Sequence, residues 1–203
     1  MTRVDLQELL SQPSVSIEDI GERLDAASPG ERVEAAFALD RGGQRKLFEK
    51  ATTAISFEHF VPAERGPREA VRHRGKNTLP LPGKHKLFEK RFCRPETDGE
   101  RLFGYNEGPS RKLIGPGYFV AVPTEAKPEW RERGAIVVDY FQVPDGAVAP
   151  GWPKVVPNTK GLQRFVFNRT RDFMRRVSRH VSIGTAYKVE KALDHYFVLV
   201  RED

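Results

Sequence analysis

The segment from Arg72 to Lys76 holds a dense group of cationic side chains. Arg72, His73, Arg74 and Lys76 surround Gly75. A glycine lets the backbone approach a ligand closely, because it has no side chain. Guanidinium and ammonium groups form strong, charge-assisted hydrogen bonds with phosphate and carboxylate oxygens. We therefore predict that this segment contacts an anionic ligand.

Residues 86–94 alternate cationic side chains with aromatic rings. In an extended chain, Lys86, Phe88, Lys90, Phe92 and Arg94 lie on one face. Single-stranded nucleic acids bind to surfaces of this kind, because bases stack on the rings and phosphates meet the cations. The same pattern is typical of an edge strand that lysines protect from pairing with other chains, with the phenylalanines covered by other elements. Both interpretations stay open. The predicted ligand-binding residues are Arg72, His73, Arg74, Lys76, Lys86, Lys90 and Arg94.

Asp139 interrupts an apolar run that the sequence predicts to be a buried strand. Ile136, Val137 and Val138 precede it, and two aromatic residues follow it. A buried carboxylate must be paired or protonated, because desolvation of the isolated charge is costly. Asp139 is therefore either the acidic half of a structural ion pair with an arginine or the general acid or base of an enzyme.

Other chemistry finds little support in the residue spacing. No two of the five histidines are three or four residues apart, so none are placed as paired ligands on one helix face, and we predict no metal site. The phosphate-binding, dinucleotide-binding and serine-hydrolase motifs are absent from the sequence. Cys93 is flanked by Phe92 and Arg94 in an expected strand, so we interpret it as a small hydrophobic residue. Nothing in the sequence indicates a cofactor.

Charge divides the chain into two parts. The 203 residues carry 34 basic and 28 acidic side chains, a net charge of +6. Residues 1–58 hold 7 basic and 11 acidic side chains, so residues 59–203 hold the remaining 27 and 17. The basic part is expected to meet an anion, such as a nucleic acid, a phosphate-bearing metabolite or a membrane surface, or else the acidic part of its own chain.

The pattern of apolar residues predicts three parts along the chain. Residues 1–57 repeat apolar positions at helical spacing, with serines placed as helix caps, and form an expected helical unit. Residues 58–83 are rich in proline and glycine, which favours a linker or a functional loop. Residues 84–203 are expected to form a core domain of antiparallel strands and one helix.

Short runs of aromatic and β-branched residues, separated by turn signals, predict the strands of the core domain. The expected strands cover residues 86–94, 101–105, 118–122, 135–143, 181–188 and 196–201. The turn Thr97-Asp98-Gly99 is expected to join the first two as a hairpin. Residues 160–178 place apolar side chains on one helical stripe and basic ones opposite, which predicts an amphipathic helix. The predicted fold class is α+β, with a curved antiparallel sheet of about six or seven strands packed on this C-terminal helix.

These patterns favour a cytoplasmic binding protein for an anionic small molecule, held in a pocket between sheet and helix. The alternatives are a sequence-tolerant protein that binds RNA or single-stranded DNA, and an enzyme that uses Asp139 as general acid or base. No apolar run is long enough to cross a membrane, and Asp5 and Glu8 stand where a signal peptide would be basic and then apolar.

Overall fold

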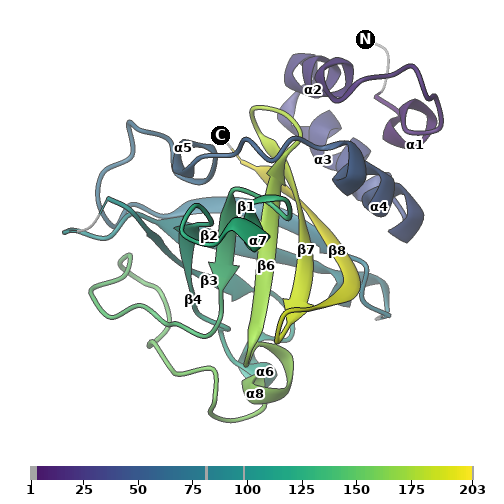
Figure 1. Ribbon diagram of the computed structural model, residues 1–203. Coiled ribbons are helices and arrows are strands. Elements are labelled where there is room, and N and C mark those ends of the chain that lie inside the picture. Colours follow the sequence, from purple (N-terminus) through teal and green to yellow (C-terminus); the bar gives the residue numbers. More distant parts are fainter. Residues whose placement is uncertain (1–3, 81, 98, 203) are drawn as a thin grey trace.

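The computed structural model describes residues 4–80, 82–97 and 99–202. It is built around a closed barrel of eight antiparallel strands, in which each strand pairs with the next and β1 pairs with β8 (Figure 1). The strands are β1 (Val71–Asn77), β2 (Leu87–Cys93), β3 (Leu102–Glu107), β4 (Phe119–Pro123), β5 (Ile136–Asp139), β6 (Thr170–Arg176), β7 (Val181–Lys188) and β8 (Lys191–Arg201).

The barrel corrects the predicted fold class. The expected α+β arrangement, an open curved sheet of six or seven strands on one helix, is wrong. Strands β1 and β6, which the sequence analysis did not predict, close the sheet: β1 joins β8 to β2, and β6 joins β5 to β7. Closure satisfies the backbone hydrogen-bonding groups that an open sheet would expose at its two edges.

The prediction of an amphipathic helix over residues 160–178 is also wrong. Only α8 (Gln163–Val166) is helical in this region, and the chain continues as strand β6. Arg169 lies between the two elements in the left-handed region, with φ of 59°, and ends any helical path. Hydrogen bonds from β6 to both β5 and β7 are available only as a strand, and they complete the barrel wall.

The burial of β6 on both faces explains why its apolar residues predicted a helix and not a strand. Met174 belongs to the cluster inside the barrel, whereas Phe173 packs on the outer face against Trp130 of helix α7 (Pro128–Arg131). A strand covered on both sides loses the alternation of apolar and polar residues, so periodicity does not separate it from a buried helix.

Strand β1 lies within the segment that the sequence analysis assigned to a linker or loop. Val71, His73 and Gly75 are buried, while Arg72 and Arg74 are exposed. The period of two is that of a half-buried strand. The sequence pattern did not predict this strand, because a histidine and a glycine occupy two of its buried positions, where apolar residues are expected.

Strand β2 is not the edge strand that its lysines suggested. It pairs with β1 on one side and with β3 on the other. Phe88, Lys90 and Phe92 share one face, as the alternation predicts, but that face lines the inside of the barrel. Asp98, part of the turn predicted between β2 and β3, lies outside the described residues.

The two ends of the barrel differ. At one end, here called the closed end, α5 (Phe57–Phe60) covers the interior (Figure 1). The centroid of its Phe60 ring lies 4.9 Å from that of Phe92. The other end, here called the open end, carries the connection with η1 (Gly83–Lys86), α6 (Arg111–Ile114), α8 and the turn between β7 and β8.

Three glycines make room for three phenylalanine rings inside the barrel. Gly75 stands directly across from Phe88, Gly104 from Phe119, and Gly184 from Phe197 on the neighbouring strands. A Cβ atom on Gly75 would lie 2.6 Å from Phe88 Cζ, which is too close for a side chain. Each ring therefore lies flat over its glycine partner, a pairing that stabilises glycine within a strand.

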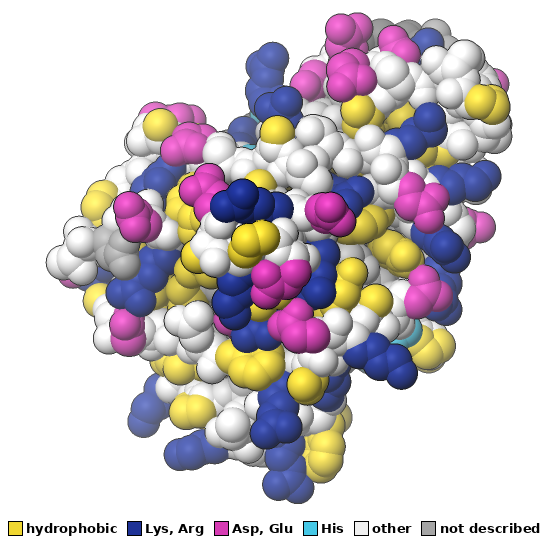
Figure 2. Space-filling model, viewed as in Figure 1, with side chains coloured by type: hydrophobic (Ala, Val, Ile, Leu, Met, Phe, Trp, Pro, Cys, Tyr) yellow, Lys and Arg dark blue, Asp and Glu magenta, His cyan; other side chains and the backbone are white. Residues whose placement is uncertain are grey.

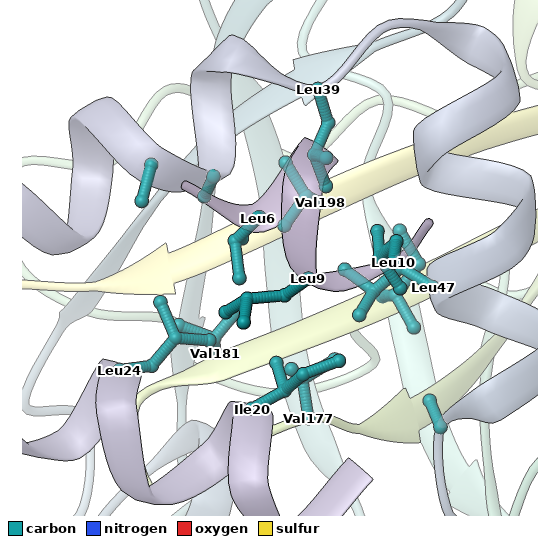
Figure 3. Close-up of a cluster of buried hydrophobic side chains, with 14 of the residues drawn as sticks. Leu6, Leu9, Leu10, Ile20, Leu24, Leu39, Leu47, Val177, Val181 and Val198 are labelled. Carbon is teal, nitrogen blue, oxygen red and sulfur yellow. The ribbon is translucent and has the colours of Figure 1, made fainter. Parts of the chain in front are cut away.

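The N-terminal helices cover the outside of β7 and β8. They are α1 (Leu6–Leu9), α2 (Ile17–Ala26), α3 (Pro29–Ala38) and α4 (Arg41–Lys50), and they lie together beside these strands (Figure 1). Ser16 and Ser28 form capping boxes that start α2 and α3. Leu6, Leu9 and Leu24 of the helices pack against Val181 and Val198 of the strands (Figure 3).

The helices and the outer barrel wall therefore share one buried apolar cluster. The predicted division into a helical unit of residues 1–57, a connecting segment of residues 58–83 and a core of residues 84–203 stays a prediction. No described helix is long and apolar enough to cross a membrane.

Candidate functional site

A cavity of about 510 Å³ occupies the open end of the barrel. An eight-stranded barrel is just wide enough to enclose one small ligand. Apolar side chains from several strands and from α6 and α8 form much of the wall. They include Leu79, Leu87, Phe88, Ile114, Phe165, Val166, Phe167, Leu193 and Phe197.

Lys90 lies at the floor of this cavity, with only 2% of its side chain exposed. Its Nζ donates to Asp172 Oδ2 at 3.0 Å, to Asn106 Oδ1 at 3.1 Å, and to the hydroxyl of Tyr140. These three bonds use all three ammonium donors. The buried cation is therefore fully hydrogen-bonded and is paired with one carboxylate.

Aromatic rings surround the Lys90 ammonium. The centroids of Phe119, Tyr140 and Phe197 each lie 5.0 Å from Nζ, and that of Phe88 lies 5.8 Å away. The faces of phenylalanine rings attract a cation at these distances, more strongly where water is excluded, whereas Tyr140 contacts the ammonium through its hydroxyl. Three of the four rings are those that lie over glycines, so the pairs of glycine and phenylalanine across the strands build the surroundings of Lys90.

Tyr140 and Asn106 connect the cluster to the barrel wall. Asn106 Nδ2 donates to Tyr140 Oη at 3.0 Å and to the backbone oxygen of Gly117 at 2.9 Å. The Tyr140 hydroxyl lies 3.3 Å from Asp172 Oδ2, to which it donates. The Tyr140 ring stacks on Phe167, with centroids 5.3 Å apart. The polar floor is thus fixed by residues of three strands, β2, β3 and β6, and by the segments just before β4, just after β5 and after α8.

One oxygen of Asp172 is left for a ligand. Its Oδ2 accepts from both Lys90 and Tyr140, while its Oδ1 has no hydrogen bond within the described part of the chain. A carboxylate oxygen only accepts, so the group that complements it is an O–H or N–H donor.

Burial dominates the electrostatics of the floor. It lowers the pKa of Lys90, although the Asp172 carboxylate opposes the change. Burial, together with Asp172, raises the pKa of Tyr140 well above its ordinary value, so the phenol keeps its proton. One cation and one carboxylate balance each other, and the floor presents hydrogen-bonding groups with no net charge.

The rim of the cavity is polar. Arg111 Nε pairs with Glu107 Oε1 at 2.6 Å, and Lys188 Nζ donates to the backbone oxygen of Phe165 at 3.2 Å. His85 Nδ1 lies 3.4 Å from the hydroxyl of Ser110. Polar groups thus occur at two levels, at the rim and at the floor, with an apolar wall between them.

No protein-family model, no curated protein and no solved structure matches this chain. Across residues 4–80, 82–97 and 99–202, no group of three or more His, Cys, Asp or Glu side chains is placed to hold a metal ion. The candidate site is therefore defined by its own geometry, with Lys90, Asn106, Tyr140 and Asp172 as the polar floor.

Of the seven predicted ligand-binding residues, Lys90 alone is among the described residues that line this cavity. Arg72 and Arg74 point outward from β1 and are exposed. Arg72 Nη2 lies 3.1 Å from Glu202 Oε2, and Arg74 Nε lies 3.8 Å from Glu202 Oε1. Together with Arg201 they line a surface pocket of about 320 Å³ next to α3, away from the open end.

Lys76 and His73 have local roles. Lys76 Nζ donates to the backbone oxygens of Phe37 and, at 3.0 Å, Leu39, and so caps the end of α3. His73 is fully buried at the closed end, where its Nε2 lies 2.9 Å from the backbone oxygen of Phe60.

Lys86 and Arg94 lie at opposite ends of β2. Lys86 belongs to η1 at the open end, outside the set of cavity-lining residues. Arg94 donates from Nη2 to the backbone oxygen of Val61 at 2.7 Å, at the closed end. The structure therefore brings Arg72 and Arg74 together at one surface pocket and places the other five predicted residues elsewhere.

Asp139 is buried on the outer side of the barrel wall. Its Oδ2 lies 3.4 Å from Arg171 Nε, and its Oδ1 accepts from the backbone N–H of Phe141 at 2.9 Å. The residue stands across from Arg171 on the neighbouring strand and does not line the cavity. Its role as general acid or base stays a prediction.

Cys93 is also buried on the outer face. It packs with Phe103, Val120 and Ala149. Burial raises the pKa of its thiol to about 11, so the thiolate needed for nucleophilic attack is scarce near neutral pH.

Sequence reasoning missed Asn106, Tyr140 and Asp172. Asp172, like Asp139, is a carboxylate within a run of residues that is buried. This pattern could have indicated Asp172 from the sequence. The assignment of its segment to a helix placed it on a solvated face, and the signal was lost.

Proposed function

We propose that this protein binds a small, mainly apolar molecule in the open end of the barrel. In this proposal the ligand presents a neutral hydroxyl group to the polar floor. The observation that carries the proposal is the fully buried Lys90, hydrogen-bonded to Tyr140 and Asp172, at the bottom of an apolar-walled cavity of about 510 Å³.

The charge balance of the floor selects the ligand group. A second anion beside Asp172 would leave one buried negative charge without a counterion, which is strongly unfavourable. A hydroxyl group avoids this cost, because it donates to the free Oδ1 of Asp172 without adding charge. The anionic character predicted from the sequence stays a prediction. An acidic ligand group would find its favourable position at the rim, near Arg111 and Lys188.

The wall supports an apolar ligand body. Phe88, Phe167 and Phe197 line the cavity between floor and rim. Transfer of apolar surface from water to such a wall contributes about 25 cal/mol per Å². The wall therefore supplies affinity, and the floor supplies orientation and selectivity.

The test compares three ligands of equal length: a ten-carbon alcohol, the matching carboxylic acid and the matching alkane. Displacement of an environment-sensitive fluorescent dye reports their affinities. We expect the alcohol to bind more tightly than the alkane by about tenfold or more, the value of one hydrogen bond to a charged group. We expect the acid to bind more weakly than the alcohol.

A double variant removes the polar floor. Lys90→Met alone leaves Asp172 without its partner, which costs about 3 to 5 kcal/mol of folding free energy. Lys90→Met combined with Asp172→Leu replaces the buried pair by apolar side chains, a change that proteins often tolerate. We expect this double variant to fold and to lose its preference for the alcohol over the alkane.

The outer ion pair gives a matched control. Asp139→Leu combined with Arg171→Met removes a cation and a carboxylate from the same barrel wall, but on its outer face. This control should keep the preference for the alcohol. Failure of wild-type protein to bind any of the three ligands, or an unchanged preference in the Lys90→Met and Asp172→Leu variant, would refute the proposal.

Binding of a nucleic acid was predicted from the alternating cationic and aromatic side chains of residues 86–94, and this face is not on the surface. Phe88, Lys90 and Phe92 face the barrel interior, and 2% or less of Lys90 and of Phe92 is exposed. Binding of RNA or single-stranded DNA stays a prediction that would need another surface.

A further inference from the structure

The exposed apolar side chains of this protein gather at the open end. In the described part of the chain, seven large hydrophobic residues are exposed; six of them stand in or beside an element of that end, and Phe141 lies on the outer wall against Arg171. The seven are Leu87, Leu113, Phe141, Leu162, Phe165, Val166 and Val189. Leu113 of α6 is 74% exposed and Phe165 of α8 is 65% exposed. Single exposed hydrophobic residues are common, but their concentration on one surface marks an interaction site.

Basic residues surround the same surface. The connections that form the open end comprise residues 78–80, 82–86, 107–118, 158–169 and 188–191, and they hold nine Lys or Arg against two acidic residues, Glu107 and Glu190. Exposed cations with no ion pair in the described residues include Lys84, Lys112, Lys160, Arg164, Arg169 and Lys191. In Figure 2, basic and hydrophobic side chains lie next to each other at the lower end of the molecule.

The two helical turns α6 and α8 hold these groups next to each other. The backbone N–H of Gly117, just after α6, lies 3.3 Å from Gln163 Oε1 of α8. Each turn presents a basic residue beside an exposed apolar one: Lys112 precedes Leu113, and Arg164 precedes Phe165. Both turns lie at the lower end of the barrel (Figure 1).

We propose that the open end docks on a bilayer that contains anionic phospholipids. Leu113 and Phe165 would enter the boundary between headgroups and acyl chains, while the surrounding lysines and arginines contact lipid phosphates. Cations around an apolar patch are the arrangement by which a protein lies on such a surface, and each cation near an anionic membrane adds to the attraction.

Charge complementarity favours this partner over another protein with an apolar patch. A purely apolar partner would not need nine bases, and it would leave them poorly solvated at the contact. The cavity opens between α6, α8 and η1, so docking would bring its mouth to the layer in which small apolar molecules dissolve. This inference deepens the proposed function; it shares Phe165 and the rim with the cavity, but it does not rest on the polar floor and does not require an occupied cavity.

Flotation with lipid vesicles tests the proposal. Wild-type protein should bind vesicles of phosphatidylcholine mixed with phosphatidylglycerol, and should bind pure phosphatidylcholine vesicles at least about tenfold more weakly. Lys112→Glu combined with Arg164→Glu should weaken binding to the anionic vesicles by about tenfold or more, because two attractive charges become repulsive. Leu113→Ser combined with Phe165→Ser should weaken it by at least about fivefold, because less apolar surface is buried.

A charge-matched control separates local contact from net charge. Arg23→Glu combined with Lys46→Glu makes the same change in net charge on α2 and α4, beside the other end of the molecule, where both side chains are exposed. This control should keep binding within about twofold, and every variant should keep the wild-type melting temperature. Equal loss in the control would overturn the proposal.

Other outcomes overturn it as well. Absence of vesicle binding, or binding that Leu113→Ser and Phe165→Ser leave unchanged, would show that no docking of this kind occurs. If Lys112→Glu and Arg164→Glu abolished binding of a fluorescent oligonucleotide but not of vesicles, the surface would belong to a nucleic-acid partner. The Lys90→Met and Asp172→Leu variant distinguishes the two proposals, because it should bind vesicles normally whether or not it binds the alcohol.

Discussion

The two ends of the barrel are built from the same eight strands but are filled differently. From the closed end inward to the floor, Phe60, Phe92 and Phe119 form a chain of ring contacts with centroids 4.9 and 5.2 Å apart. At the open end, the side chains that point inward leave about 510 Å³ unfilled, above a polar floor centred on Lys90. A close-packed interior stabilises a fold, whereas an unfilled one reduces its stability.

This difference separates the structural part of the barrel from the candidate functional part. The closed end supplies the packing that holds the wall in place. The open end combines a buried ion pair, a cavity and exposed apolar side chains, which are features of recognition sites. Recognition residues are therefore expected at the open end, and stability residues at the closed end.

The largest effect should come from truncating a ring at the closed end. Phe92 is fully buried and contacts Phe60, His73 and Phe119. Phe92→Ala should lower the free energy of unfolding by about 3 to 5 kcal/mol, measured by urea denaturation. The matched change at the open end, Phe165→Ala, should alter it by no more than about 0.5 kcal/mol. Equal costs at the two sites would show that the open end is part of the structural core.

An intermediate effect should come from adding one methyl group under a ring. A Cβ atom on Gly104 would collide with the Phe119 ring and with the backbone oxygen of Arg91, which cannot move away. A Cβ atom on Gly184 would meet the Phe197 ring, which borders the cavity, and the Sδ atom of Met174, which belongs to a flexible side chain. Overpacking typically lowers the free energy of unfolding by about 1 to 3 kcal/mol. We expect a loss near the top of this range for Gly104→Ala and near the bottom for Gly184→Ala.

Thermal or chemical denaturation of both variants measures this difference, with Gly66→Ala as the control. A Cβ atom on Gly66 meets nothing within 4 Å, so this variant should keep wild-type stability. The reverse order of the two costs would mean that the cavity is filled or rigid in the protein, and the contrast between the ends would be wrong.

The smallest expected effect is a loss of folding stability at acidic pH that arises from a histidine at the closed end. His59 is buried there, and burial, aided by the nearby His73 and Arg201 side chains, lowers its pKa well below the ordinary value. The neutral ring is favoured in the folded state, while the unfolded chain takes up a proton below about pH 6.5. Stability should therefore fall as the pH drops below that value, by up to about 1.4 kcal/mol per pH unit for this one proton.

Melting temperatures between pH 7.5 and 5.0 measure this dependence. His59→Gln removes the titrating group, so the variant should lose less stability than the wild type across this range. Parallel curves for the two proteins would show that His59 does not contribute, and that the closed end is open enough for its imidazole to be charged.

Much of the local structure was predictable from the sequence. Capping serines and the spacing of leucines correctly predicted the N-terminal helices, and turn signals located six of the eight strands. The alternation in residues 86–94 placed Phe88, Lys90 and Phe92 on one face, as observed. These features depend on neighbours within a few residues, which the sequence order itself supplies.

Closure of the barrel was decided by tertiary structure. Strand β1 is stabilised by pairing with β8, more than 100 residues later, and β6 by pairing on both sides between β5 and β7. Neither strand has a distinctive pattern of its own, because β1 buries a histidine and a glycine and β6 is covered on both faces. Hydrogen bonds to distant strands outweighed the local helical tendency of residues 160–178.

The candidate site followed from that closure. The sequence determined that Lys90 lies among aromatic residues on one strand face, but it left open whether that face meets solvent or the interior. Only the ring of eight strands brings Asn106, Tyr140 and Asp172 to within hydrogen-bonding distance of its ammonium group. Residue order fixes which side chains share a face, whereas the contacts between distant strands fix what that face encloses.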